Sequence, residues 1–264
     1  MNTTTLKPKT YNFYSVIIGT ELLNGRRVDA HFSFLNTELL KRGWTHKGSF
    51  VIKDEPPFME AIYKLIKEDP DSVMFSFGGI GATPDDYTRV CAANVFTNGN
   101  MEQNIGAKEA IEEQFGSEAY PNRIQMANLP VGAGLLKNVV TNVPGFYLEN
   151  RFFFVPGFPS MAKSMVIEAL DKFYAQNTQR TYTLTMSAYC SEEKLISTMK
   201  TISSDVDMSS LPIIEGDNRY AIISISSKDE NLTKQEFKKF IDYCEQNNIK
   251  YVLEDIREEL IKPS

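Results

Sequence analysis

Three closely spaced glycines and a pair of carboxylates stand in one segment, residues 73–90, which reads VMFSFGGIGATPDDYTRV. Its hydrophobic beginning is typical of a buried strand, and the residues after the glycines are typical of the first turn of a helix. A glycine turn between a strand and a helix leaves backbone N–H groups open to a ligand, and the helix dipole favours negative charge there. The pattern therefore predicts a site for an anion, such as the phosphate of a nucleotide, at Gly78, Gly79, Gly81 and Thr83.

The two carboxylates add a second requirement. Asp85 and Asp86 would repel a phosphate unless a divalent cation lay between them, so the loop predicts a metal as well as an anion. We expect Asp86 to be the catalytic and metal-binding carboxylate and Asp85 to support it. Ordinary helix capping is the alternative, with Thr83 as the N-cap, Pro84 in the first turn and Asp86 three residues after the cap. Capping alone does not account for the three glycines.

A second loop with candidate ligands covers residues 19–29 and follows the first expected strand. The carboxyl ends of parallel strands form the edge of the sheet where ligands bind. Gly19, Glu21 and Asp29 are therefore candidates for ribose or metal contacts. We expect Glu21 to be a metal ligand together with Asp86. Asp29 could equally cap the helix that begins at residue 30, and both alternatives stay open.

The third loop, residues 129–158, is rich in proline, glycine and asparagine. Two Pro–Gly pairs flank an expected hairpin beside the edge of the sheet. Such pairs usually make tight turns, but here they could also border a pocket and offer backbone amides to a ligand. The candidate ligand-binding residues of this loop are Asn142, Gly145, Pro156 and Gly157.

Other reactive side chains lack evident partners in the sequence. Arg89 lies one turn beyond the acidic pair and could neutralise a phosphate, although a solvated position on the helix face is favoured. Cys91 has no base nearby and His31 has no serine or cysteine partner, so a nucleophilic triad is not supported. Because the chain has only two histidines, we expect any metal to be a divalent cation held by oxygen, such as Mg, Mn or Co.

The composition is that of an ordinary globular protein and argues against several classes. A formal net charge of −6 argues against a general binder of nucleic acids or of anionic membranes. No apolar stretch approaches the length of a membrane span, and the N-terminus lacks the apolar core of a signal peptide. The three cysteines are widely spaced and without CxxC motifs, which is typical of reduced thiols. We expect a cytoplasmic protein.

The elements that must position these loops alternate between strand and helix. Residues 1–12 are expected to be a flexible tail, and residues 13–176 to form an α/β domain. The expected elements lie at residues 11–18, 30–42, 44–52, 56–69, 73–77, 85–96 and 102–115. This order with short connections predicts a parallel, doubly wound sheet. After it, residues 126–158 are expected to form loops and short strands before a last helix from Pro159 to near Gln176.

A short linker at residues 177–179 is expected to lead into a small α+β domain, residues 178–264, of βαββα-like order. Its expected strands and helices lie at residues 181–189, 191–202, 219–226, 233–247 and 249–253. This part of the chain has no glycine-rich loop and no cluster of ionisable residues with obvious chemistry.

Four segments together resemble the competence/damage-inducible protein A (CinA) family, whose first domain is related to the molybdopterin adenylyltransferases. The segments are IGTELLNGRRVDAHFSFLNTELLKRGW, FGGIGATPDDYTR, MANLPVGAGLLKNVVTNVPGFYLE and FFFVPGFPSMAKSM. They follow the order and spacing of the family and cover roughly residues 13–175.

The resemblance implies a three-layer α/β/α, molybdopterin-binding-like domain that binds a nucleotide or pterin at the carboxyl edge of its sheet. It also implies a metal-dependent pyrophosphatase that acts on ADP-ribose or a related dinucleotide, with the acidic residue of the glycine motif at Asp86. A non-catalytic module for molybdopterin or a nucleotide, linked to molybdenum cofactor metabolism, is the alternative, and an assembly protein is a third. We expect a homo-oligomer, a dimer or trimer, in each case.

The chain departs from the family pattern in several places. Residues 29–31 read Asp-Ala-His where the family usually has Asp-Thr-Asn, which removes a hydroxyl and an amide. Ala82 replaces a proline of the glycine motif. Met161 stands where the family has a glutamate, which weakens a carboxylate-based mechanism. Nothing after residue 177 resembles the amidohydrolase domain of full-length CinA proteins, so deamidation of nicotinamide mononucleotide is not expected.

Overall fold

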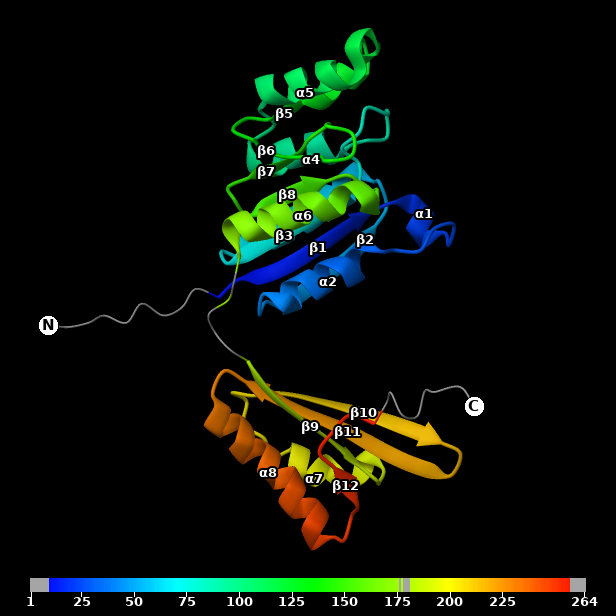
Figure 1. The fold of residues 1–264 in the computed structure, drawn as a ribbon, viewed down its shortest axis with the longest axis vertical. Coiled ribbons are helices and arrows are strands. Elements are labelled where there is room, and N and C mark those ends of the chain that lie inside the picture. The colour runs from blue at the N-terminus through cyan, green and yellow to red at the C-terminus, as the bar shows by residue number, and fades with distance from the viewer. Residues whose placement is uncertain (1–9, 176, 178–180, 257–264) are drawn as a thin grey trace, which may run out of the picture. The chain divides into compact units, whose positions relative to one another are not determined.

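The computed structural model describes residues 10–175, 177 and 181–256, and Figure 1 shows their fold. The chain divides into two compact units, Met1–Thr178 and Gln179–Ser264, each with a sheet and a hydrophobic core of its own.

The boundaries of the first unit differ in detail from those expected. The expected flexible tail lies outside the described residues up to residue 9, and the first strand begins at Asn12. The expected linker also lies outside them, except for Asn177. The N–H of Asn177 donates to the carbonyl oxygen of Arg42 at 2.8 Å, so this residue is attached to the first unit.

A six-stranded sheet, with the order β2-β1-β3-β8-β7-β6, forms the centre of the first unit. The strands are β1 (Asn12–Ile18), β2 (His46–Ile52), β3 (Ser72–Phe77), β6 (Gly134–Leu136), β7 (Gly145–Leu148) and β8 (Phe152–Val155). The first three and β8 run parallel, whereas β7 pairs antiparallel with β8, and β6 with β7. The expected parallel sheet is therefore present, with an antiparallel hairpin added at one edge.

Both faces of the central strands β3 and β8 are buried. In β3, Val73 and Phe75 belong to one hydrophobic core and Met74 to the other, and in β8 Phe153 and Phe154 divide in the same way. Side chains alternate between the two faces of a strand, so a strand that is apolar throughout needs cover on both sides. The continuous hydrophobic runs of the sequence thus correspond to fully covered strands.

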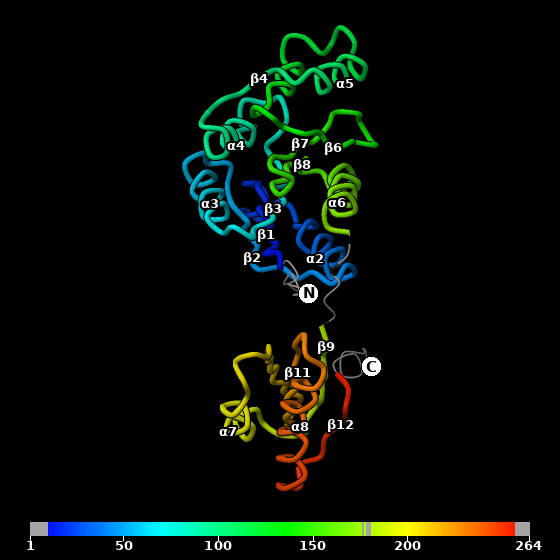
Figure 2. Tube along the Cα trace, turned by 90° about the vertical axis from the view of Figure 1, so that its left-hand side faces the viewer, coloured from blue at the N-terminus to red at the C-terminus, as the bar shows by residue number. Residues whose placement is uncertain are grey.

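Helices provide this cover in two layers, as expected for an α/β/α domain. Figure 2 shows α3 and α4 on one side of the sheet and α2 and α6 on the other. These helices are α2 (His31–Lys41), α3 (Pro56–Glu68), α4 (Thr88–Phe96) and α6 (Pro159–Phe173). Smaller elements are α1 (Thr20–Leu23), α5 (Ile105–Phe115), the 3₁₀ turns η1 (Gly116–Ala119) and η2 (Arg123–Ala127), and the paired strands β4 (Met101–Gln103) and β5 (Asn128–Pro130).

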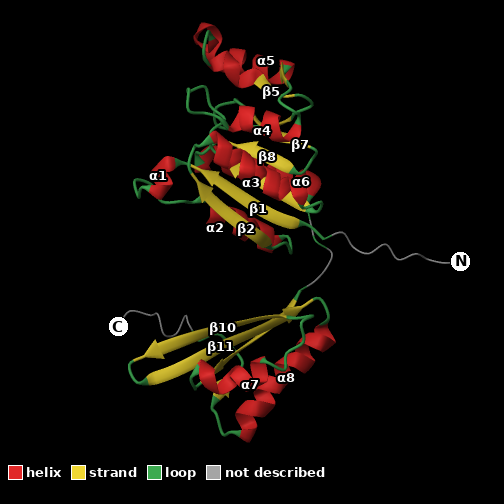
Figure 3. Cartoon of the chain, turned by 180° about the vertical axis from the view of Figure 1, so that it is seen from behind, coloured by secondary structure: helices red, strands yellow, loops and turns green. Residues whose placement is uncertain are grey.

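The second unit is a four-stranded antiparallel sheet with helices on one face (Figure 3). Its elements are β9 (Tyr182–Ala188), η3 (Glu192–Leu195), α7 (Ile196–Met199), β10 (Asp207–Glu215), β11 (Asn218–Ser227), α8 (Glu230–Gln246) and β12 (Tyr251–Val252). The side chain of Asp229 caps α8 by accepting from the N–H groups of Asn231 and Leu232. The α+β class is confirmed.

Three local expectations were wrong. The helix expected from Asp85 begins only at Thr88, because residues 83–87 form a turn. Residues 101–103 pair as a strand instead of starting a helix. Residues 207–215 form the edge strand β10, which was not expected because its exposed alternation and Pro212 give a weak strand signal. Among the described residues, no helix has the length and apolarity to cross a membrane.

The burial of the central strands can be tested by comparing a buried valine with an exposed one. Val73 is fully buried and Val139 is 68% exposed. We expect Val73→Ala to destabilise the first unit by about 2 kcal/mol, because it removes buried methyl groups and leaves a cavity, whereas Val139→Ala changes stability by less than about 0.5 kcal/mol.

Urea unfolding followed by tryptophan fluorescence measures this difference in the first unit alone, since Trp44 is the single tryptophan of the chain and lies in its core. Equal stabilities of the two variants would contradict the assigned burial.

Candidate functional site

A cleft of about 570 Å³ opens at the carboxyl ends of β1, β3 and β8. The loops that the sequence singled out meet there. Of the residues expected to bind a ligand, the cleft is lined by Gly19, Glu21, Gly78, Gly79, Gly81, Thr83, Asp85, Asp86, Pro156 and Gly157. The strands' parallel order explains the convergence, because their carboxyl ends share one edge of the sheet.

The glycine loop, residues 78–81, is held by the first turn of α4 through its carbonyl groups. The carbonyl oxygen of Gly78 accepts from Thr88 Oγ1 at 2.8 Å, and that of Gly79 accepts from Thr88 N at 3.0 Å. Arg89 Nη1 donates to the carbonyl oxygens of Ile80, at 2.7 Å, and Gly81. Arg89 is therefore a brace of the loop, and the solvated position favoured from the sequence was wrong. Burial lowers the pKa of Arg89, an effect that the charge of Asp86 opposes.

The direction of these carbonyl groups determines that of the N–H groups. In a trans peptide the N–H of the next residue points opposite to the C=O, and the described residues contain a cis bond only at Tyr120–Pro121. The N–H groups that point away from α4 are those of Gly79, Ile80, Gly81 and Ala82. Within the described part of the chain none of them donates to a protein acceptor. Consecutive unpaired N–H groups beside a cleft form an anion-binding concavity.

Glycine is required at the start of this loop by both conformation and space. Gly78 and Gly79 have φ values of +102° and +67°. A Cβ atom at Gly78 would lie 2.7 Å from the carbonyl oxygen of Ile18, and one at Gly79 would lie 2.5 Å from Thr88 Oγ1. The close approach of β1, β3 and α4 thus leaves no room for a side chain.

The acidic turn after the glycines does not cap α4 in the way that the capping alternative required. Asp86 Oδ2 accepts from Thr83 N at 2.8 Å and from Thr83 Oγ1, so the aspartate holds the threonine. Helix α4 starts after Tyr87, which makes no side-chain capping bond. Among the described residues no donor contacts Asp86 Oδ1. One carboxylate oxygen of Asp86 is therefore free to face a ligand or a proton.

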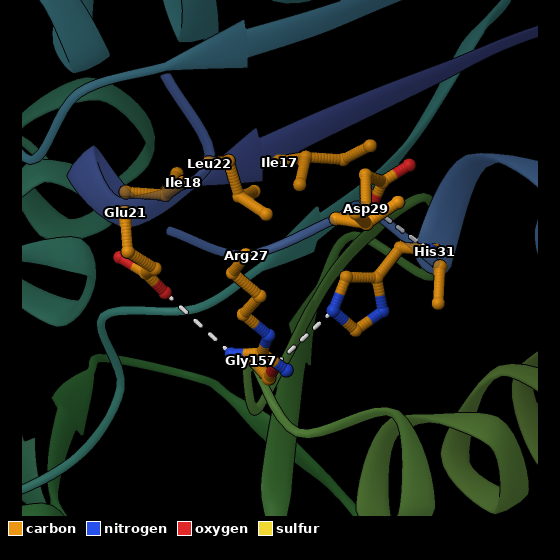
Figure 4. Close-up of a pocket in the computed structure, with 10 residues that line it drawn as sticks. Ile17, Ile18, Glu21, Leu22, Arg27, Asp29, His31 and Gly157 are labelled. Carbon is orange, nitrogen blue, oxygen red and sulfur yellow. Dashed lines mark hydrogen bonds and ion pairs between the residues drawn. The ribbon is translucent and has the colours of Figure 1, made fainter. Parts of the chain in front are cut away.

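Next to the glycine loop, two side chains meet at the carbonyl group of Gly157, in a small pocket beside the cleft (Figure 4). Arg27 Nη2 donates to the carbonyl oxygen of Gly157 at 2.8 Å, and His31 Nε2 lies 3.1 Å from the same atom. Because a carbonyl oxygen can only accept, Nε2 of His31 carries the proton. Burial lowers the pKa of His31, whose ring stacks on Phe77 at 4.5 Å. The residue that replaces the family's asparagine thus has a structural role.

Acidic side chains dominate the charged part of the lining. Glu21 lies 3.5 Å from Arg27, and Asp54 Oδ2 accepts from the N–H and hydroxyl of Thr20 at 3.0 and 3.1 Å. Nevertheless, no three His, Cys, Asp or Glu side chains of the described residues are placed to hold a metal ion together. The donor set therefore does not fit a metal site made by the protein alone. A Mg²⁺ ion bound by one or two carboxylates plus ligand phosphates would need no such cluster.

Three expected ligand residues are engaged elsewhere. Asp29 caps α2, with its carboxylate accepting from the N–H groups of His31 at 2.9 Å and Phe32 at 3.1 Å. Asn142 has a φ of 56° and donates to Glu113 at 2.9 Å. Gly145 is buried in β7, where a Cβ atom would lie 2.7 Å from the carbonyl oxygen of Phe154. None of the three lines the cleft, which corrects the expectation for Asn142 and Gly145 and selects capping for Asp29.

The cleft is also lined by residues that were not predicted to bind a ligand. They are Ile18, Arg27, Asp54, Ile80, Ala82, Phe115, Met126, Asn138, Thr141, Val143, Phe158 and Met161. Asp54 follows the end of β2, so the edge rule that selected Glu21 could have found it. Phe115 and Met126 come from segments distant in the sequence, and no local pattern pointed to them.

Nucleophilic chemistry by a protein side chain is not supported by the geometry. Burial raises the pKa of the Cys91 thiol to about 12, and its Sγ lies 3.9 Å from the carbonyl oxygen of Pro56. A thiol in that state is a poor nucleophile at neutral pH. The polar groups of the cleft lining are backbone N–H donors, carboxylates, one guanidinium, two threonine hydroxyls and the amide of Asn138.

Comparisons with known proteins agree with this architecture. Residues 15–175 match a family described as a probable molybdopterin binding domain. A CinA-like protein of Synechocystis sp. is 31% identical over 157 residues, which are 57% of this chain and 37% of that protein. The matching region thus spans little more than a third of that relative.

For two further relatives the match spans almost the whole length of the relative. Protein TK1472 of Thermococcus kodakarensis is 26% identical over 248 residues, 88% of this chain and 96% of that protein. The crystal structure of CinA from Thermoplasma acidophilum, described as having unknown function, superposes with a TM-score of 0.55 at 25% identity, covering 61% of this chain and 97% of that one. Because the family match spans more than half of the chain and contains the glycine loop, the chain belongs to the family of probable molybdopterin binding domains, and its first unit is CinA-like.

Proposed function

We propose that the cleft binds a nucleotide or a phosphorylated pterin through its phosphate. The observation that carries this proposal is the run of unpaired N–H groups from Gly79 to Ala82, whose direction is imposed by Thr88 and Arg89. Such groups bind anions without a side-chain charge.

The size and chemistry of the remaining cleft suit the organic part of such a ligand. Its volume of about 570 Å³ is within the usual range for small-molecule sites. One wall is apolar, with Ile80, Phe115, Met126 and Val143 partly buried against the hydrophobic core. A flat aromatic base or pterin ring can pack on such a wall while its phosphate contacts the glycine loop.

We further propose that the bound ligand is ADP-ribose or a related dinucleotide, and that its pyrophosphate is hydrolysed. In this reaction the oxygen of a water molecule bonds to one phosphorus, the P–O bond to the bridging oxygen breaks, and AMP and ribose 5-phosphate are released. Asp86 accepts the proton of the water at Oδ1, and the N–H groups of the loop stabilise the charge that develops on the phosphoryl oxygens.

A divalent cation accompanies the ligand in this proposal. The lining carries the carboxylates of Glu21, Asp54, Asp85 and Asp86. These charges repel a naked pyrophosphate, so a cation carried by the phosphates and contacted by Asp86 would neutralise both sides. Its chemical contribution would be to withdraw charge from the phosphoryl oxygens.

Binding without turnover is the second candidate function. The observation in its favour is that no described cluster of three metal-binding side chains accompanies Asp86. Calorimetry with molybdopterin, AMP and ADP-ribose separates the two candidate functions. Tight binding without AMP release supports a non-catalytic binding module, and absence of binding rejects both functions.

Self-association of the chain as a dimer or trimer also stays a prediction.

The hydrolase proposal predicts AMP release from ADP-ribose that requires Mg²⁺. We expect EDTA to abolish the release and Asp86→Asn to lower the rate about a hundredfold or more, because the amide cannot accept the proton. Chromatographic measurement of AMP over time tests both expectations.

Asp205→Asn is the matched control for charge, since Asp205 is exposed, belongs to the second unit and is not among the cleft-lining residues. An unchanged rate in Asp86→Asn, or no AMP release by the unsubstituted protein, would rule out the hydrolase.

The brace formed by Arg89 predicts a second effect, on affinity. Arg89→Lys keeps the charge, but a flexible ammonium group replaces the planar guanidinium whose Nη1 donates to the carbonyl oxygens of Ile80 and Gly81. We expect AMP to bind about tenfold more weakly, because a peptide group of the loop can then turn. Calorimetry measures the change.

Arg219→Lys serves as the control, because Arg219 in the second unit also donates to two carbonyl oxygens, those of Gly216 and Asn218, at 2.8 and 2.9 Å. If both variants bind AMP like the unsubstituted protein, the brace has no part in anion binding.

A further inference from the structure

Arg27 is the one lysine or arginine among the described residues that line the cleft. It stands in the loop between α1 and α2, at the carboxyl edge of β1. Every other charged side chain of the lining is acidic. A positive group in an otherwise acidic cleft has a large effect on which anion can enter.

The contacts of Arg27 hold its guanidinium in place without using all of its donors. Nη2 donates to the carbonyl oxygen of Gly157 at 2.8 Å, and Nη1 lies 3.5 Å from Glu21 Oε1. A guanidinium carries more N–H donors than these two contacts use. No other hydrogen bond from it reaches an acceptor among the described residues. Its side chain is 34% exposed and lines the cleft.

The residue whose carbonyl oxygen anchors Arg27 lies against the start of the glycine loop. A Cβ atom built on Gly157 would be 3.3 Å from the Cα of Gly78. Gly157 therefore touches the first residue of the loop, and the guanidinium bound to it is near the phosphate site. His31 also donates to this carbonyl oxygen at 3.1 Å, so Arg27 is not needed merely to satisfy it.

We propose that Arg27 binds a second phosphate, next to the one held by the glycine loop, and so makes the cleft selective for diphosphates over monophosphates. The inference rests on the proposed phosphate site and names its ligand class. Guanidinium groups bind phosphate oxygens through paired, charge-assisted hydrogen bonds. In the free protein Glu21 lies 3.5 Å from Nη1, so its carboxylate competes with the ligand for the guanidinium.

ADP and AMP are matched probes for this inference, since they differ by one phosphate. Calorimetry at a constant Mg²⁺ concentration gives the ratio of their affinities. We expect the unsubstituted protein to bind ADP about tenfold more tightly than AMP, and Arg27→Gln to remove this preference while AMP affinity changes less than about twofold. Arg27→Lys should keep part of the preference through its charge.

The neighbouring Arg26 provides the control, because it is exposed and does not line the cleft. Arg26→Gln should keep the full preference for ADP. Fluorescence of Trp44 reports whether each variant remains folded. A second variant, Glu21→Gln, frees the guanidinium and should increase the ratio of ADP to AMP affinity, which keeps a test available if Arg27→Gln does not fold.

The outcomes separate the two proposals. If Arg27→Gln prefers ADP as strongly as the unsubstituted protein, or if Glu21→Gln leaves the ratio unchanged, the role of Arg27 is wrong and the phosphate site stands. If the unsubstituted protein binds neither nucleotide, the phosphate site itself is wrong and the inference falls with it.

Discussion

The site depends on the hydrogen bonds that hold the carbonyl groups of residues 78–81 to the first turn of α4. Thr88 and Arg89 fix four successive peptide groups, and the planarity of the trans peptide then turns the N–H groups to the other side. The N–H groups of a loop usually donate to acceptors within a turn or to water. Here their direction is set without a ligand, so the proposed binding of an anion would need no rearrangement of the backbone.

The same edge of the sheet combines these unpaired N–H groups with acidic side chains. Carboxylates beside a phosphate are unfavourable unless positive charge lies between them. Two sources of positive charge are consistent with the lining, a cation brought by the ligand and the guanidinium of Arg27. With both sources present, the affinity for the proposed ligand would depend on its number of phosphates and on the concentration of the divalent cation. Such a dependence is expected of a site that binds small molecules with more than one phosphate.

Much of the fold followed from patterns within short stretches. Local sequence signals predicted the parallel sheet and the edge at which its strands end. These signals are the apolar runs of β1, β3 and β8, the glycines after β3, and the prolines at the start of α3 and α6. The weakly patterned segments were harder. In β10, exposed residues and Pro212 carry little strand signal, and only pairing with β11 makes this segment a strand.

The sequence by itself predicted an anion site at Gly78, Gly79 and Gly81, because three glycines between an apolar run and the start of a helix leave backbone N–H groups open. The tertiary structure alone decided the roles of the charged residues. Arg89 turned inward to the loop, Asp29 became a helix cap, and Arg27 reached the carbonyl oxygen of Gly157, 130 residues away in the chain. A side chain's partner depends on which distant segments the fold brings within hydrogen-bonding distance, and no local pattern of residues contains that information.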